Sequence, residues 1–148
     1  MYFEDFEVGM VFDEEIEDYT FTEEEIIESG KKYDPRPIHI DKEAAKKSRF
    51  KGLIASGSYA NMVFWGQWVK TGIDASGIVA GYGVDEGRWI RPIYPDVTYN
   101  IKVEVVNKEV RKEGENGLVT TKLTAYNPDG EAVLTYTATA LVNFRAKE

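Results

Sequence analysis

The sequence predicts an α+β protein in which a mostly antiparallel sheet of about five strands packs around one long helix. Three patterns support this fold class: a capping box near residue 22, apolar side chains at helical spacing over 58–70, and a two-residue alternation from residue 78 onward. The chain has 148 residues, of which 43% are apolar and 30% charged, as is typical of one globular domain. We therefore expect a single domain over residues 1–148.

The N-terminal part predicts an exposed strand followed by a helix. Residues 10–20 combine β-branched and aromatic residues with carboxylates, which is typical of a strand that faces solvent. The sequence from Thr22 to Glu25 matches a capping box, because the Thr22 hydroxyl can accept from the Glu25 amide while the Glu25 carboxylate reaches back. We expect a helix over about 22–32.

Two prolines end this helix and separate it from the next one. Pro35 and Pro37 lack an amide hydrogen, and each restricts the residue before it, so residues 33–40 are predicted as a stiff loop. Asp41 follows and is placed to cap a second, short helix over about 42–48.

The long helix and most of the sheet lie in the remainder of the chain. Over 58–70 the apolar residues cover the helix nearly all round, which predicts that it is buried. The alternation predicts one strand over 78–90 and a three-stranded antiparallel meander over 97–145. Turns are expected at Glu115-Asn116-Gly117 and at residues 127–130, where Asn, Pro, Asp and Gly occur together.

The counts of cysteine and histidine restrict the chemistry of the chain. With Cys 0, thiol nucleophiles, disulfides and thiolate zinc sites are excluded, and a reducing compartment is favoured. With His 1, no multi-histidine metal centre can form within one chain, while magnesium or calcium bound by carboxylates stays possible. The acidic N-terminus has no secretory signal pattern, and no apolar run reaches the length of a membrane span. We expect a cytoplasmic protein with no metal and no membrane contact.

Charge is distributed unevenly along the chain. The net charge of −8 counts against nucleic-acid binding. Residues 1–30 contain twelve carboxylates and no Lys or Arg, whereas residues 31–51 contain eight basic and three acidic residues. This basic segment is either the solvated face of a short helix or a rim that binds phosphate groups.

His39 is the candidate acid or base of the chain, and Asp34 lies five residues before it. A carboxylate and an imidazole suffice to abstract and deliver a proton. Their spacing does not bring them together unless the chain turns between them. The alternative is that His39 is a structural residue and that Asp34, before a proline, only forms a turn.

The segment Ala55-Ser56-Gly57-Ser58 precedes the long helix. Its backbone amides lie at the positive end of the helix dipole, where they can stabilise developing negative charge, and Gly57 would let a ligand approach closely. The alternative is that Ser56 or Ser58 caps the helix and that Gly57 only eases packing.

Three segments resemble the MaoC-like dehydratases, relatives of the (R)-specific enoyl-CoA hydratases. These segments are Tyr33–Asp41, Phe50–Gly57 and Gly83–Pro92, within a similarity that extends from Phe6 to Val142. The resemblance implies the hotdog fold, in which an antiparallel sheet is wrapped around a central long helix. It also implies a homodimer or higher homo-oligomer with acyl-thioester sites at the subunit boundary, and no cofactor besides the coenzyme A of the substrate.

The resemblance also assigns roles to residues. Asp34 and His39 become the catalytic pair that activates a water and moves a proton at the α-carbon of a trans-2-enoyl thioester. Gly57 becomes the donor whose amide holds the thioester oxygen. The basic segment would meet the phosphates of coenzyme A or an acidic acyl carrier protein. The residues placed around the substrate are Arg36, Lys51, Ser56, Ser58 and Tyr59.

Two other functions stay open on the same fold. One is thioester hydrolysis, in which a carboxylate activates water toward the carbonyl. The other is a non-catalytic module that binds acyl thioesters. Arg36 stands where the family usually has Asn or Gln, and a cation beside the pair would favour the binding module if it disabled the pair.

Overall fold

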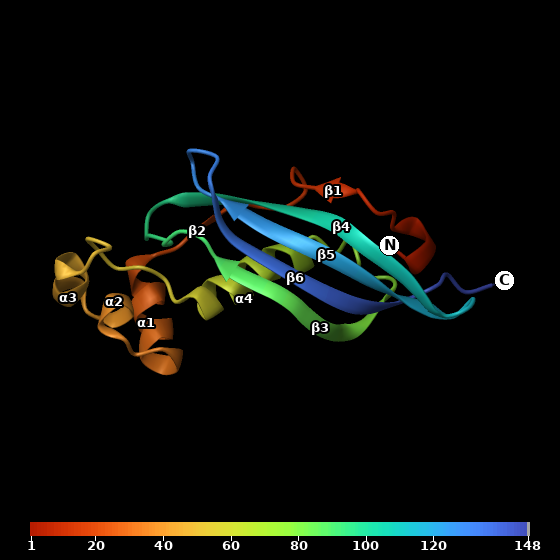
Figure 1. Cartoon of the computed structure of the whole chain (residues 1–148), viewed down its shortest axis with the longest axis horizontal. Helices are drawn as coiled ribbons and strands as arrows, with labels where there is room; N and C mark the ends of the chain where they lie inside the picture. Colours follow the sequence, from red (N-terminus) through yellow and green to blue (C-terminus); the bar gives the residue numbers. More distant parts are fainter. Residues whose placement is uncertain (148) are drawn as a thin grey trace.

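The computed structural model describes residues 1–147 and shows a six-stranded antiparallel sheet with helix α4 packed against one face (Figure 1). The strands follow the order β1-β4-β5-β6-β3, and β2 also pairs with β4. Their bounds are β1 Val11–Phe12, β2 Tyr19–Thr20, β3 Ile78–Trp89, β4 Thr98–Lys112, β5 Asn116–Tyr126 and β6 Ala132–Asn143. The predicted α+β class is confirmed.

The short helices gather at the end of the molecule where α4 begins (Figure 1). They are α1 (Glu23–Tyr33), α2 (Pro37–Ile40) and α3 (Lys42–Lys47), while α4 spans Gly57–Val69 and a 3₁₀ turn, η1, spans Phe3–Asp5. None of the helices within residues 1–147 has the length and apolar content needed to cross a bilayer. Both predicted caps form: Thr22 and Glu25 make the capping box of α1, and Asp41 accepts from the amides of Glu43 and Ala44.

Aromatic side chains fix α4 against the sheet. The ring of Phe64 meets that of Phe21 edge to face with centroids 5.5 Å apart, and the rings of Trp68 and Phe12 lie 5.2 Å apart. Each such pair contributes about 0.5–1.5 kcal/mol beyond the burial of its area. The alternation of β4 supplies the opposing surface, since Tyr99, Ile101, Val103 and Val105 are all buried.

The prediction that α4 is buried nearly all round is wrong for its outer face. Met62 is 71% exposed and Val69 50% exposed. The sheet covers only one side of the helix, so the remaining apolar residues face outward. Part of this outer face, at Val69, adjoins the edge strand β3.

Two predictions for the first third of the chain are corrected. Residues 10–20 form two short strands, β1 and β2, because a turn closed by the bond from the Ile16 amide to the Asp13 carbonyl interrupts the pairing with β4. The sheet therefore has six strands instead of five. The predicted loop over 33–40 contains the single turn α2, because Pro37 occupies its first position, where no amide hydrogen is needed.

The predicted turn at Glu115-Asn116-Gly117 is also corrected. The hairpin turns at Gly114, whose φ is +71°, and Asn116 and Gly117 already belong to β5. At Gly117 a glycine is required by close packing and not by a turn. A Cβ there would lie 2.6 Å from the Glu109 carbonyl oxygen and would overlap the ring of Phe3. The turn over residues 127–130 forms as predicted, with φ of +78° at Gly130.

We predict that Gly117→Ala lowers the free energy of unfolding by about 1–3 kcal/mol, because the new methyl group forces the Phe3 ring and β4 apart. The matched control is Gly83→Ala in β3, where a Cβ would meet nothing within 4 Å. Urea unfolding of both variants measures the difference. Equal midpoints for the two variants would contradict the packing argument.

Candidate active site

Glu25 connects α1 to two other elements. Its Oε1 accepts from the hydroxyl of Tyr19 at 2.6 Å and from that of Tyr59 on α4 at 2.9 Å, while Oε2 accepts from the Thr22 amide at 2.9 Å. Burial acts to raise the pKa of Glu25, but the hydrogen bonds from Tyr19, Thr22 and Tyr59 outweigh it and lower the pKa below its usual value. Burial and the bond to Glu25 raise the pKa of Tyr19 to about 12. The carboxylate thus fixes α1, and the residues that follow it, relative to α4.

The chain turn between α1 and α2 brings Asp34 and His39 together. Asp34 is the C-terminal cap of α1, Pro35 stops the helix, and Pro37 starts the single turn of α2 that carries His39 inward. The Nε2 of His39 lies 3.5 Å from Oδ2 of Asp34, and their side chains are 7% and 22% exposed. The turn that the spacing required is therefore present.

A backbone carbonyl sets the protonation of the His39 ring. Nδ1 of His39 lies 2.7 Å from the carbonyl oxygen of Ile54. Because a carbonyl oxygen only accepts, Nδ1 carries a hydrogen, so the neutral tautomer has its lone pair on Nε2, the nitrogen that faces Asp34. The Ile54 amide donates in turn to the carbonyl of Ile38 at 3.1 Å, so the turn of α2 is held to the segment that enters α4.

Gly30 allows α2 to approach α1 closely. A Cβ at this position would lie 2.9 Å from Cγ2 of Ile40 and 3.1 Å from the carbonyl oxygen of His39. Any larger residue would therefore press on the His39 backbone. Gly30 belongs to the support of the site although it lies nine residues before His39 in the sequence.

His39 and Gly57 line the same cavity, which has a volume of about 280 Å³. Gly57 is the first residue of α4, so its amide has no acceptor within the helix. The indole ring of Trp89, at the end of β3, lies where a Cβ of Gly57 would be. Ser56 occupies the N-cap position, but its side chain makes no capping hydrogen bond. An oxygen atom in this cavity could therefore meet an imidazole on one side and free helix amides on the other.

Arg36 is directed at Asp34. One of its terminal nitrogens, NH1, lies 2.8 Å from Oδ1 and 2.9 Å from Oδ2 of Asp34, while the side chain as a whole is 73% exposed. The guanidinium and the imidazole both contact the carboxylate, and the guanidinium does so from the solvent side. Because the Arg36 side chain is largely exposed, its guanidinium can also meet a further anionic group.

The other residues predicted to contact a substrate differ in their exposure and in their hydrogen bonds. Ser56 is buried, Ser58 and Lys51 are exposed, and the hydroxyl of Tyr59 donates to Glu25. The backbone of Lys51 has φ of 63°. Contact of these residues with a substrate stays a prediction. The eight basic residues of segment 31–51 are all exposed, and the segment forms the end of α1, the helices α2 and α3 and the loop after them.

Three contributors to the site escaped the sequence reasoning. Trp89 lines the cavity and lies within the segment Gly83–Pro92, which carries the family resemblance. This resemblance is the sequence feature that could have indicated a role for Trp89. Ile54 acts through its carbonyl oxygen, which no side-chain pattern reveals. The sequence indicates Glu25 only as a helix cap, because its two tyrosine partners are brought to it by the fold: Tyr19 lies six residues before it on β2, and Tyr59 lies 34 residues after it on α4.

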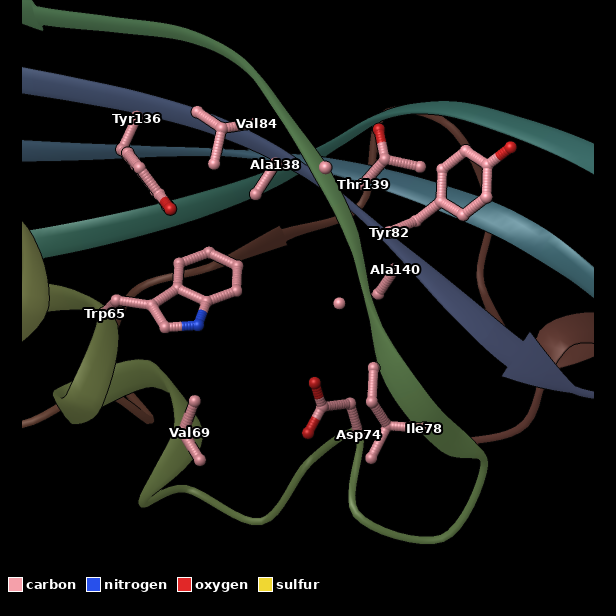
Figure 2. A pocket seen from close by; sticks show the side chains of 12 residues that line it. Trp65, Val69, Asp74, Ile78, Tyr82, Val84, Tyr136, Ala138, Thr139 and Ala140 are labelled. Carbon is pink, nitrogen blue, oxygen red and sulfur yellow. The ribbon is translucent and has the colours of Figure 1, made fainter.

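A second hollow, of about 460 Å³, runs between α4 and β3 (Figure 2). Trp65 and Val69 of α4 line one side, and Val84 of β3 and Tyr136 of β6 line the other. Asp74 points into it from the loop after α4, and burial raises the pKa of this carboxyl above its usual value. The hollow is mostly apolar and opens along the free edge of the sheet.

Comparison with known proteins supplies the family context. A sequence model of the MaoC-like domain matches residues 6–127. The uncharacterized protein YdeM of Bacillus subtilis is 32% identical over 127 residues, which cover 86% of this chain and 88% of that protein. The mesaconyl-CoA hydratase of Cereibacter sphaeroides is 34% identical over 95 residues, which cover 64% of this chain and 28% of that longer protein.

A solved structure shares the whole architecture. The MaoC-like dehydratase from Rhodospirillum rubrum is 30% identical, covers 99% of both chains and superposes with a TM-score of 0.89. The fold is therefore the hotdog fold that the sequence predicts, with α4 as its central helix.

We predict that Glu25→Gln lowers the free energy of unfolding by about 1–3 kcal/mol at neutral pH, because a neutral amide accepts these hydrogen bonds less strongly. The folded pKa of Glu25 is lowered, so its contribution is full well above the unfolded value of about 4.3 and is lost as the pH falls through the folded pKa. In acid, the free energies of unfolding of Glu25→Gln and of the unaltered protein should become equal. Urea unfolding at neutral and acid pH measures this.

The matched control for that experiment is Glu24→Gln, which makes the same change at an exposed position one residue earlier. It should leave the free energy of unfolding within about 0.5 kcal/mol of the unaltered protein. If the difference in the free energy of unfolding between Glu25→Gln and the unaltered protein stays the same in acid, the charge of the carboxylate does not contribute to the stability.

Proposed function

Since the chain belongs to the MaoC-like domain family, we propose that it catalyses the reversible hydration of a trans-2-enoyl thioester to a 3-hydroxyacyl thioester. The acyl group would be carried by coenzyme A or by an acyl carrier protein. The observation that carries this proposal is the 3.5 Å approach of His39 Nε2 to Asp34 beside a cavity shared with Gly57. Similarity to the mesaconyl-CoA hydratase supports the same class of reaction.

In the proposed reaction a water molecule lies beside both members of the pair. It donates one hydrogen to the Asp34 carboxylate and the other to Nε2 of His39, since both atoms are acceptors. As the water oxygen bonds to C3, His39 takes its proton and Asp34 stabilises the imidazolium that forms. The proton then passes to C2, so that the elements of water are added across the double bond and the enzyme is restored.

Gly57 would stabilise the charge that this step creates. The thioester oxygen gains enolate character when C3 is attacked, and a backbone amide at the start of α4 is oriented to donate to it. Loss of one such donor costs about 2.7–4 kcal/mol of barrier. No cofactor takes part in the proposed mechanism beyond the coenzyme A of the substrate.

The exposed basic side chains near the site would hold the carrier. Arg36 and Lys51 lie in the segment around α1 to α3 that bears eight basic residues, and both are exposed. Phosphate groups of coenzyme A, or carboxylates of an acyl carrier protein, complement this charge. Ser56, Ser58 and Tyr59 would line the thioester path at the start of α4.

The free edge of the sheet supports a homodimer or higher homo-oligomer. Within residues 1–147, β3 pairs only with β6, and eleven of its twelve residues are exposed. Tyr82, Val84 and Trp89 are each more than half exposed on β3, and Tyr82 and Val84 line the hollow along α4 (Figure 2). An unpaired apolar edge favours pairing with another chain. A second copy would cover both the edge and the hollow.

We predict that the protein hydrates crotonyl-CoA, seen as loss of the enoyl absorbance, and that Asp34→Asn and His39→Ala each reduce kcat/KM by at least about 10²-fold, because the first removes the negative charge that stabilises the imidazolium and the second removes the base that takes the proton of the water. The control is Asp129→Asn, a carboxylate in the turn after β5, which should retain full activity. Unchanged rates in both site variants would refute the proposed pair. Release of free thiol without hydration would instead identify thioester hydrolysis.

We predict that the protein in solution has the mass of at least two chains and that Val84→Lys shifts it toward one, because the new charge cannot be buried between two β3 edges. Light scattering measures the mass. The control is Val106→Lys, which makes the same change at an exposed position of β4. A monomeric unaltered protein would contradict the interface.

A further inference from the structure

Trp89 occupies an unusual position for a tryptophan. It is the last residue of β3, and it lines the cavity of His39 and Gly57 while its side chain is 61% exposed. An indole has a large apolar body and one polar group, the Nε1–H, which donates a hydrogen bond and cannot accept one. At the wall of a cavity, both parts can contact a ligand.

The polar part of this indole lies against Gly57. A Cβ at Gly57 would overlap three atoms of the five-membered ring, Nε1, Cε2 and Cδ1. The amide nitrogen of a residue is about 2.5 Å from its Cβ, so Nε1 of Trp89 lies within about 5 Å of the Gly57 amide nitrogen. A side-chain N–H and a backbone N–H are therefore neighbours at the wall of the same cavity.

Neither of these two donors is used by the fold within residues 1–147. The Gly57 amide belongs to the first turn of α4, where the helix has no carbonyl to offer it, and no loop carbonyl accepts from it. The side-chain hydrogen bonds of the described residues include those of the nearby Arg88 and Arg91 but none of Nε1 of Trp89. Both N–H groups are thus available to a ligand.

The separation of the two donors suits one shared acceptor. A hydrogen bond to oxygen is about 2.9 Å long, so a single oxygen can accept from two donors that lie up to about 5.8 Å apart. In the proposed hydration, the thioester oxygen gains enolate character beside Gly57, and the amide of Gly57 occupies only one of its lone pairs. Sites that stabilise such an oxygen combine backbone and side-chain donors.

We propose that Nε1 of Trp89 donates a hydrogen bond to the thioester oxygen together with the Gly57 amide. The inference rests on the proposed function and makes Trp89 a further catalytic residue of that reaction. Because the oxygen gains its charge only as C3 is attacked, this hydrogen bond is stronger in the transition state than in the bound substrate. It therefore acts on kcat more than on KM.

The test measures hydration of crotonyl-CoA by Trp89→Phe and Trp89→His at about pH 8, where a histidine side chain is mostly neutral. Trp89→Phe keeps an aromatic ring and removes the N–H, so kcat should fall at least about tenfold while KM stays within about twofold. Trp89→His keeps a nitrogen at the ring position of Nε1 and should retain more activity than Trp89→Phe. A purely apolar contact predicts the opposite order, since phenylalanine is the more apolar side chain.

The matched control is Trp65→Phe, the same substitution at a tryptophan that lines the hollow between α4 and β3 and not the cavity of His39. Its kcat should stay within about twofold of that of the unaltered protein. A loss of kcat equal to that of Trp89→Phe would overturn the inference, because it would not depend on the N–H beside Gly57.

The indole N–H also reports the contact directly in ¹⁵N–¹H NMR spectra, where its resonance is identified by its absence in Trp89→Phe. It should move downfield when acetoacetyl-CoA binds, because the thioester oxygen accepts from it. The matched probe is S-butyl-CoA, a thioether that has no thioester oxygen and should shift the resonance much less. Equal shifts with the two compounds would overturn the inference.

The remaining outcomes separate this inference from the function on which it rests. Hydration by the unaltered protein with an unchanged kcat in Trp89→Phe overturns the role of Trp89 alone. If light scattering shows that Trp89→Phe has lost the oligomer, kcat is measured at a protein concentration that restores its mass. Recovery of full activity there would assign Trp89 to a subunit contact. Absence of turnover by the unaltered protein overturns the proposed function and this inference with it.

Discussion

The hydrogen bond between Nδ1 of His39 and the carbonyl of Ile54 is the contact on which the site depends. It decides which ring nitrogen carries the hydrogen, and so leaves Nε2 as an acceptor opposite Asp34. It also joins the turn of α2 to the segment that precedes α4. A second hydrogen bond, from the Ile54 amide to the carbonyl of Ile38, joins the same two segments. Backbone hydrogen bonds therefore fix the position of the imidazole relative to the first amides of α4. The site is thus preorganised before a ligand binds.

A second level of support lies one layer out, on α1. Glu25 holds the start of that helix to α4 and β2, while Gly30 at its other end lets the His39 backbone approach without a clash. A partly buried carboxylate that receives several hydrogen bonds is rigid but sensitive to acid, whereas a glycine contact is insensitive to pH. The helix that ends at Asp34 is thus positioned at both ends by different physical means.

Local chemistry made much of the fold predictable from the sequence, and tertiary contacts account for what it missed. The capping box at Thr22, the cap at Asp41 and the alternation of β4 depend on residues within a few positions of one another, and all appear as expected. The Asn116-Gly117 pair was interpreted as a turn because that is its usual local meaning, but Gly117 responds to Phe3, which lies more than a hundred positions away. The same applies to the site. The candidates Asp34, His39 and Gly57 were identifiable as residue types, whereas the carbonyl of Ile54 and the ring of Trp89 reach them only through the folded chain.

Arg36 shows how a departure from the family pattern can be accommodated. The guanidinium contacts both oxygens of Asp34, yet it does so from the exposed side, and Oδ2 of the same carboxylate still lies 3.5 Å from Nε2 of His39. Because Arg36 is largely in solvent, its charge is screened, and its principal effect is geometric: it fixes the rotation of the carboxylate. A neutral amide at this position could orient the same carboxylate by a hydrogen bond without a charge. The arginine therefore orients Asp34 and adds an exposed cation beside it, which suits the anionic carrier of the proposed function.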